Sequence, residues 1–154
     1  MKLSLLLPAA QVRVPMAATS KDAAIEELLA LLPLESDEQR REVRESVLKR
    51  ETELSTGIGR GVAIPHGKTS AVTRHVCAFG VATHPVDFGA MDGQPCRIFF
   101  LCVSSSKQSL EHVRVLAQVA RVLNNQEARR ALECATSAEE VRRVFVDDEQ
   151  REGL

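Results

Sequence analysis

Six consecutive apolar residues, Ile98 to Val103, are the feature of this 154-residue chain that most restricts its fold. A strand with one solvent-facing side alternates polar and apolar residues, whereas a continuous apolar run is typical of a strand buried on both faces. We therefore expect this segment to be the central strand of a sheet, with Phe99 and Phe100 both buried. A sheet of this kind needs helices on both of its faces.

The segments around this run carry the periodicity of amphipathic helices. Two helices are predicted in the first third of the chain, at about 20–33 and 36–50, and each has a serine suited to cap its N-terminus. Three more are predicted towards the C-terminus, at about 110–123, 126–134 and 137–146. Five helices are enough to cover both faces of the expected sheet.

Strand candidates complete the predicted order of elements. They are 11–14, 62–64, 75–83 and the apolar run at 98–103. Pro15 is expected to end the first strand, because proline lacks the backbone N–H that pairs strands. The resulting order, β-α-α-β-β-β-α-α-α, does not alternate strictly, so the sheet should be mixed rather than all parallel. We therefore predict a mixed α/β fold, a three-layer α/β/α sandwich.

Length and composition favour a single domain over residues 1–154, since a chain of this size can bury one hydrophobic core and no linker-like segment is present. The core is expected at about 5–146, followed by a charged, frayed tail at 147–154. The apolar run at Leu3–Leu7 ends at Pro8, short of the roughly 7–15 residues of a signal peptide, and nothing approaches the roughly 20 residues of a membrane span. We therefore expect a cytoplasmic protein that is not embedded in a membrane.

Composition and charge exclude several classes of site. The net charge is −1 and no long basic run occurs, which argues against nucleic acid as the partner. Tryptophan and tyrosine, which stack on bases, are absent. The cysteines form no C-x-x-C pair and the histidines lack metal-ligand spacing, so we predict neither a metal site nor a cofactor. Buried, reduced thiols are the favoured state, with a disulfide or metal role as the open alternative, for Cys77, Cys96, Cys102 and Cys134.

The segment Thr56–Lys68 is the most informative in chemical terms. Three glycines at alternate positions let the backbone bend sharply and approach a ligand or partner, although the segment lacks the sequence of a P-loop or a dinucleotide motif. His66 follows between a proline and a glycine, just after an apolar strand. A neutral imidazole is a good nucleophile towards phosphorus, and an ordinary pKa of about 6.5 leaves one nitrogen free near pH 7. From this segment alone, the alternative that His66 is a turn histidine without a functional role stays open.

The stretch from Thr56 to Gly67, TGIGRGVAIPHG, resembles the active-site motif of the fructose/mannitol/nitrogen-type enzyme IIA family of the bacterial phosphotransferase system. The element order also resembles that family, and the similarity covers roughly Leu5 to Val146. Further resemblance lies at Arg50-Glu51, Val86-Asp87-Phe88, Asp92-Gly93-Gln94-Pro95 and Glu111-His112-Val113.

This resemblance implies a phosphocarrier protein. His66 would take a phosphoryl group from a histidine-phosphorylated, HPr-like carrier, and would pass it to a cysteine on a permease IIB domain or hold it as a regulatory signal. Arg50 would contact the phosphoryl oxygens, and His112 would be the stabilising partner of the phosphohistidine. We expect His66 to be partly exposed in a shallow depression, because a partner must reach its ring nitrogen.

The helix predicted at 110–123 carries this second histidine. Ser109 is the expected N-cap, which places His112 in the first turn, where the partial positive charge of the helix N-terminus disfavours a charged imidazole. The rings of His66 and His112 are expected within hydrogen-bonding distance or one water of each other. The expected apolar face of the helix consists of Leu110, Val113, Leu116, Ala117, Ala120 and Leu123.

The sequence of Ser55–Gly59 most resembles the nitrogen-type regulatory branch of the family. Membership of that branch is therefore the preferred hypothesis. A sugar-specific enzyme IIA of the fructose or mannitol kind is one alternative. A regulatory binding module that is never phosphorylated is the other. Arg60 departs from the family pattern, which usually has asparagine there, and a long cation at this position can change partner recognition or add a phosphate contact.

Overall fold

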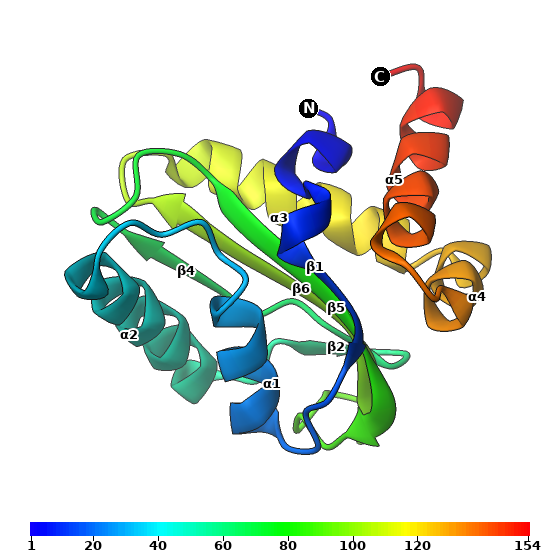
Figure 1. The fold of residues 1–154 in the computed structure, drawn as a ribbon, viewed down its shortest axis with the longest axis horizontal. Helices are drawn as coiled ribbons and strands as arrows, with labels where there is room; N and C mark the ends of the chain where they lie inside the picture. The colour runs from blue at the N-terminus through cyan, green and yellow to red at the C-terminus, as the bar shows by residue number, and fades with distance from the viewer.

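A mixed sheet of six strands forms the centre of the structure, a computed structural model that describes residues 1–154 (Figure 1). The strands are β1 (Val12–Met16), β2 (Gly57–Gly59), β3 (Val62–Ala63), β4 (His66–Thr69), β5 (Val76–Val86) and β6 (Cys96–Ser105). Their order is β1-β5-β6-β3-β2, and β4 also pairs with β6. The pairs β5–β6 and β2–β3 are antiparallel, whereas β1 is parallel to β5, and β3 and β4 are parallel to β6.

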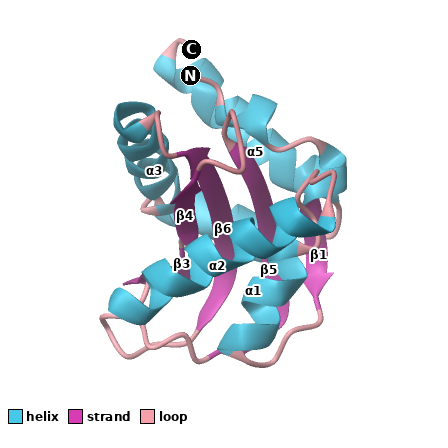
Figure 2. Cartoon of the chain, turned by 90° about the vertical axis from the view of Figure 1, so that its left-hand side faces the viewer, coloured by secondary structure: helices cyan, strands magenta, loops and turns pink.

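Five α-helices cover the two faces of this sheet. They are α1 (Lys21–Leu29), α2 (Asp37–Glu53), α3 (Ser109–Leu123), α4 (Gln126–Cys134) and α5 (Ala138–Glu152). Helices α1 and α2 enclose one apolar core against the sheet, and α3, α4 and α5 enclose a second one on the opposite face (Figures 1 and 2). None of the helices has both the length and the apolar character needed to span a membrane. The predicted mixed α/β class is therefore confirmed.

Strand β6 lies inside the sheet because it is apolar on both sides. Its partners are β5 on one edge and β3 and β4 on the other. Phe99 packs in the core beneath α1 and α2, whereas Phe100 packs in the core beneath α3 to α5, and both are fully buried. The prediction of a central strand at 98–103 with both phenylalanines buried is confirmed.

Two details of the predicted strands are wrong. Pro15 does not end the first strand, since β1 includes it and continues to Met16. Strand β1 lies at the edge of the sheet, where a missing backbone N–H is tolerated. Instead of one strand at 62–64, three short strands, β2 to β4, lie between Gly57 and Thr69. Strands of two to four residues are too short to show a period of two in the sequence.

The C-terminal residues are helical rather than frayed, so the expectation for 147–154 is wrong. Helix α5 includes all but the final two residues of this segment. The carboxylate of Asp148 pairs with an arginine of α3 at 2.7 Å, and that of Glu149 accepts hydrogen bonds from the backbone N–H and hydroxyl of Ser4, both at 2.7 Å. These long-range contacts bury both carboxylates, and the core extends beyond the expected limits of 5–146.

Helix α3 buries only part of the apolar face predicted for it: Leu123 is buried, and Leu116 and Ala120 pack against the core. Ser109 is its first residue, and the N-cap position belongs to Gln108, whose side chain makes no capping hydrogen bond, so the expected cap is wrong by one position. Leu110 and Val113 are exposed. The buried residues of the helix are His112, Val115, Val119, Val122 and Leu123.

All four cysteines are free thiols, and three are buried as predicted: Cys77, Cys96 and Cys102. Cys134, at the end of α4, is exposed, so the prediction of burial is wrong there. Burial raises the pKa of the Cys96 thiol to about 11. No three histidine, cysteine, aspartate or glutamate side chains come together in a way that could hold a metal ion.

Candidate functional site

His66 opens strand β4, directly after the conformationally rigid Pro65. Its Nδ1 atom lies 2.8 Å from the backbone oxygen of Ile64. Because a carbonyl oxygen can only accept, Nδ1 of the neutral ring carries the proton and donates it to this oxygen. The other nitrogen, Nε2, is then unprotonated and has no hydrogen-bond partner within the chain. His66 is half-buried, so the prediction that it is partly exposed is confirmed.

The surroundings of His66 favour the neutral ring. Burial is the largest cause and lowers the pKa of His66 below its usual value, and the charge of Arg50 lowers it further. The hydrogen bond to Ile64 acts in the opposite direction without reversing the shift. At neutral pH, His66 therefore presents a lone pair on Nε2, which is the protonation state that a nucleophile requires.

His112 lies beside His66, on the first turn of α3. The centroids of the two rings are 5.4 Å apart and their planes are inclined by 54°. No hydrogen bond joins the two rings, but they lie close together, as predicted, and line the same cavity. His112 is buried, and its Nδ1 atom lies 2.7 Å from the hydroxyl of Ser104 on β6.

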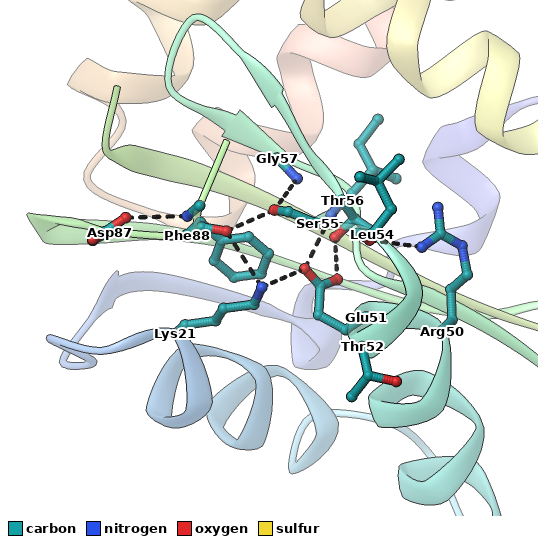
Figure 3. Close-up of polar contacts among 12 residues, drawn as sticks. Lys21, Arg50, Glu51, Thr52, Leu54, Ser55, Thr56, Gly57, Asp87 and Phe88 are labelled. Atoms are coloured by element: carbon teal, nitrogen blue, oxygen red, sulfur yellow. Dashed lines mark hydrogen bonds and ion pairs between the residues drawn. The ribbon is translucent and has the colours of Figure 1, made fainter. Parts of the chain in front are cut away.

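Arg50 comes from the last turns of α2 and lines the cavity together with both histidines. Its Nη1 atom donates a hydrogen bond of 2.7 Å to the backbone oxygen of Leu54, which holds the guanidinium group in place (Figure 3). A guanidinium group has five N–H donors, so most of them stay available to an anion. Arg50 thus has a local structural contact in addition to the phosphoryl contact predicted from the sequence.

The neighbouring residue, Glu51, anchors the segment that leads to His66 (Figure 3). Its buried carboxylate forms an ion pair with Lys21 at 2.8 Å. It also accepts hydrogen bonds from the backbone N–H and the hydroxyl of Thr56, at 3.0 and 2.5 Å. Lys21 also lies 4.8 Å from the ring centroid of Phe88, whose backbone oxygen accepts a 2.6 Å hydrogen bond from Ser55. The loop after α2 is therefore fixed at both of its ends.

Backbone contacts carry this anchoring to the histidine. The carbonyl oxygen of Thr56 accepts a 3.0 Å hydrogen bond from the N–H of Ile64, and Ile64 in turn accepts from the ring of His66. Gly67 follows, and a side chain there would collide with α2, since a Cβ atom would lie 2.5 Å from the hydroxyl of Ser46 and 3.0 Å from the backbone nitrogen of Val47. The absence of a side chain at Gly67 therefore allows helix α2 to pack closely against β4.

Two depressions of different character meet at His66 and Arg50, which line both. The first has a volume of about 500 Å³ and is lined mainly by polar and charged residues, which include His112, Ser46, Lys49, Glu53 and Lys68. The second has a volume of about 440 Å³ and is mainly apolar. Its lining includes Leu54, Ile58, Ile64, Met91, Val113, Leu116, Ala117 and Ala120.

Four residues of the apolar face predicted for α3 line this second groove: Val113, Leu116, Ala117 and Ala120. Val113 is exposed, whereas Leu116 also packs against the core, and Ile58 of β2 lines the same groove. The only signal in the sequence was that α3 has more apolar positions than a single buried face requires. The contacts of Ser104 and of the Ile64 carbonyl with the two histidines were not predicted either, because they depend on the tertiary fold.

Arg60 lies at the tip of the turn between β2 and β3, in the left-handed region with φ 58°. Asparagine adopts this conformation more readily than arginine, which accounts for the asparagine of the family pattern rather than for the arginine found here. The Nη1 atom of Arg60 donates a 2.6 Å hydrogen bond to the side-chain oxygen of Asn124, at the C-terminus of α3. The cation therefore ties the glycine turn to α3, and Arg60 does not line either depression.

A family model described as "Phosphoenolpyruvate-dependent sugar phosphotransferase system, EIIA 2" matches residues 5–147. The chain belongs to this family. Over 91% of its length, this EIIA chain is 34% identical to a nitrogen regulatory protein of Bradyrhizobium diazoefficiens, of which it covers 88%. It is also 32% identical, over 86% of its length, to the fructose-specific EIIABC component of Bacillus subtilis, but it spans only 21% of that protein.

Solved structures agree with this assignment. The nitrogen regulatory protein IIA-Ntr from Neisseria meningitidis matches the EIIA chain with a TM-score of 0.87 and 35% sequence identity, over 93% of this chain and 98% of that one. The mannitol IIA of Escherichia coli matches with a TM-score of 0.74 and 22% identity, over 90% and 97%, which shows that the fold is shared. The family resemblance predicted from the glycine segment is thus confirmed, whereas the roles of His66, His112 and Arg50 stay predictions.

Proposed function

We propose that this EIIA protein is a phosphocarrier that accepts a phosphoryl group on Nε2 of His66 from a histidine-phosphorylated, HPr-like carrier. The observation that carries the proposal is the hydrogen bond between Nδ1 of His66 and Ile64, because it leaves Nε2 as the free nucleophile at the edge of the cavity. Membership of the phosphotransferase system family supports phosphoryl transfer in general.

The proposed reaction moves a phosphoryl group from the imidazole of the donor to the imidazole of His66. Nε2 of His66 attacks phosphorus in line with the donor nitrogen, so that one N–P bond forms as the other breaks. His66 keeps its proton on Nδ1 and becomes a phosphoimidazolium, while a donor in the same phosphoimidazolium form leaves as a neutral imidazole. No net proton transfer is needed, and the reaction requires neither a metal ion nor a nucleotide.

Arg50 and His112 are proposed to hold the phosphoryl group once it is on His66. The free N–H groups of Arg50 can form charge-assisted hydrogen bonds to its oxygens, and His112 lies on the other side of the same cavity. The apolar groove next to His66 offers a docking surface for the partner protein, with Ile58, Met91 and Val113 exposed along it. Exposed apolar patches of this kind are typical of protein interfaces.

We infer that the protein acts in the nitrogen-type regulatory branch, in the cytoplasm, where its phosphorylation state would regulate a target protein. Two relatives that it covers almost completely are nitrogen regulatory proteins, one in sequence and one in structure. A sugar-specific enzyme IIA is the second candidate, since fructose-specific relatives are 32% and 33% identical. In that case the acceptor would be a cysteine on a permease IIB domain.

Mass spectrometry after incubation with phosphoenolpyruvate and the general phosphotransferase enzymes tests the proposal. We expect the mass of one phosphoryl group to be added to the wild type and to the His84→Ala variant, in which an exposed histidine is removed. The His66→Ala variant should fold and stay unphosphorylated. Labelling of His66→Ala, or a wild type that is never labelled, would refute the site. Phosphate that moves on to a IIB domain would favour the sugar-specific alternative.

A further inference from the structure

A buried serine lies next to the second histidine of the site. Ser104, near the end of β6, is fully buried, and its hydroxyl lies 2.7 Å from Nδ1 of His112. The hydroxyl has one further side-chain neighbour, the thiol of Cys102, at 3.7 Å. A hydroxyl group in this position has few partners, so the direction of its hydrogen bond to His112 can be worked out.

Strand register explains why the serine reaches the histidine. Strands β4 and β6 pair His66 with Cys102 and, two residues later, Lys68 with Ser104. Side chains two residues apart on a strand point to the same face of the sheet. Cys102 faces the core beneath α3, and Ser104 therefore faces the first turn of α3, where His112 lies.

The two neutral tautomers of His112 use this hydroxyl differently. If Nδ1 carried the proton, the hydroxyl of Ser104 would accept it, and its own hydrogen would be left with sulfur, a weak acceptor. If Nδ1 is unprotonated, the hydroxyl donates to it at 2.7 Å, within the usual range of a strong hydrogen bond. The second tautomer therefore gives the buried hydroxyl hydrogen a nitrogen acceptor, whereas the first leaves it only sulfur at 3.7 Å. Buried polar groups favour the arrangement with the stronger partners.

We propose that Ser104 is a positioning residue that fixes His112 with its proton on Nε2, a role that rests on the proposed function of His66. The two rings then hold opposite tautomers. His66 offers a lone pair on Nε2, and His112 offers an N–H donor to the cavity that both rings line. A phosphoryl group that arrives on His66 finds this donor already in place, and no proton has to move before it is stabilised.

Nitrogen-15 NMR of the unphosphorylated wild type tests the tautomer directly, since protonated and unprotonated ring nitrogens have well-separated chemical shifts. His66 is the internal reference, because its bond to Ile64 requires a proton on Nδ1. We expect the opposite pattern for His112, with Nε2 protonated and Nδ1 not. A proton on Nδ1 of His112 would overturn the inference, whatever the behaviour of any variant.

Substitutions test the link between the serine and phosphoryl transfer. Ser104→Ala should convert His112 to a mixture of tautomers and slow transfer through His66 about tenfold, as the loss of one well-made hydrogen bond predicts. Ser104→Thr keeps the hydroxyl and should restore both properties. Ser106→Ala, at an exposed serine, should change neither. A Ser104→Ala variant with the wild-type tautomer and the wild-type rate would refute the role of Ser104.

The two proposals fail in different ways. If the proposed function is wrong, the wild type stays unphosphorylated while the nitrogen spectrum of His112 still reports its tautomer. If only the inference about Ser104 is wrong, the wild type is phosphorylated on His66 while His112 carries its proton on Nδ1.

Discussion

Replacement of Glu51 by alanine should loosen the segment that positions His66. Glu51 is only 7% exposed, and its carboxylate bonds to Lys21 at 2.8 Å and to Thr56 at 3.0 and 2.5 Å. Without it, the ammonium group of Lys21 and two donors of Thr56 lose their shared acceptor. Through Ile64, the hydrogen bond that sets the tautomer of His66 loses its support as well.

The expected cost follows from these contacts. Removing one partner of a buried, hydrogen-bonded ion pair costs about 3–5 kcal/mol. The side chain of Lys21 is 31% exposed, so water can solvate part of the ammonium group, which favours the lower end, about 3 kcal/mol. For a domain of this size, this corresponds to a fall in Tm of roughly 6–12 °C. Glu51→Gln keeps an acceptor for Thr56 and should cost about 1–2 kcal/mol.

Urea and thermal unfolding measure the stability change, and the initial rate of phosphorylation, at a temperature where every variant is folded, measures the effect on His66. Glu45→Ala is the matched control, because Glu45 is an exposed glutamate on the same helix, α2, and lines neither depression. It should change stability by less than about 0.5 kcal/mol. A Glu51→Ala variant as stable and as active as this control would show that the anchoring network does not position the site.

Three further predictions concern the site itself. Arg50→Ala should slow phosphoryl transfer by about tenfold to a hundredfold, as the loss of hydrogen bonds to a charged group predicts. The free energy of unfolding, measured by urea titration, should fall by no more than about 1 kcal/mol, since the one hydrogen bond of Arg50 within the chain is to Leu54. An unchanged rate would remove Arg50 from the site. The rate at which His66 is phosphorylated should be constant near neutral pH and should fall at acid pH, because only the neutral ring attacks. Burial lowers the pKa of His66, so the midpoint of this fall should lie under about 6.5, and below the midpoint the rate should drop about tenfold per pH unit. A midpoint above that value in a pH–rate profile would contradict the burial of the ring. Val113→Asp should leave Tm within about 2 °C of the wild type, because the residue is exposed, but should raise the KM for the donor carrier about tenfold, since a charge in the apolar groove opposes docking. An unchanged KM would exclude this groove as the docking surface.

Local patterns predicted the parts of this fold that depend on local chemistry. The apolar run at 98–103 indicated the central strand, and the helix over 126–134 has the predicted boundaries, because a capping asparagine and an amphipathic pattern mark it. The buried tail did not follow from the sequence in this way. Asp148 and Glu149 look like solvent-exposed charges until the fold brings Ser4 and α3 to them.

The candidate site shows the same division. His66 could be singled out because a histidine between a proline and a glycine, after a glycine-rich turn, is an unusual local arrangement. Hydrophobic periodicity could not distinguish the core face of α3 from the side that lines the apolar groove, because exposed Val113 is as apolar as buried Val115. Ser104 lies in a run of three serines, and only the register of β4 and β6 places its hydroxyl next to His112.

The position of the phosphoryl group on the ring tests the central claim most directly. Proton–nitrogen correlation NMR of the protein phosphorylated by its carrier identifies both the histidine and the nitrogen that bears phosphorus. We predict a phosphoryl group on Nε2 of His66, with Nδ1 still protonated and bonded to Ile64. A phosphoryl group on Nδ1 of His66, or on any other histidine, would contradict the claim.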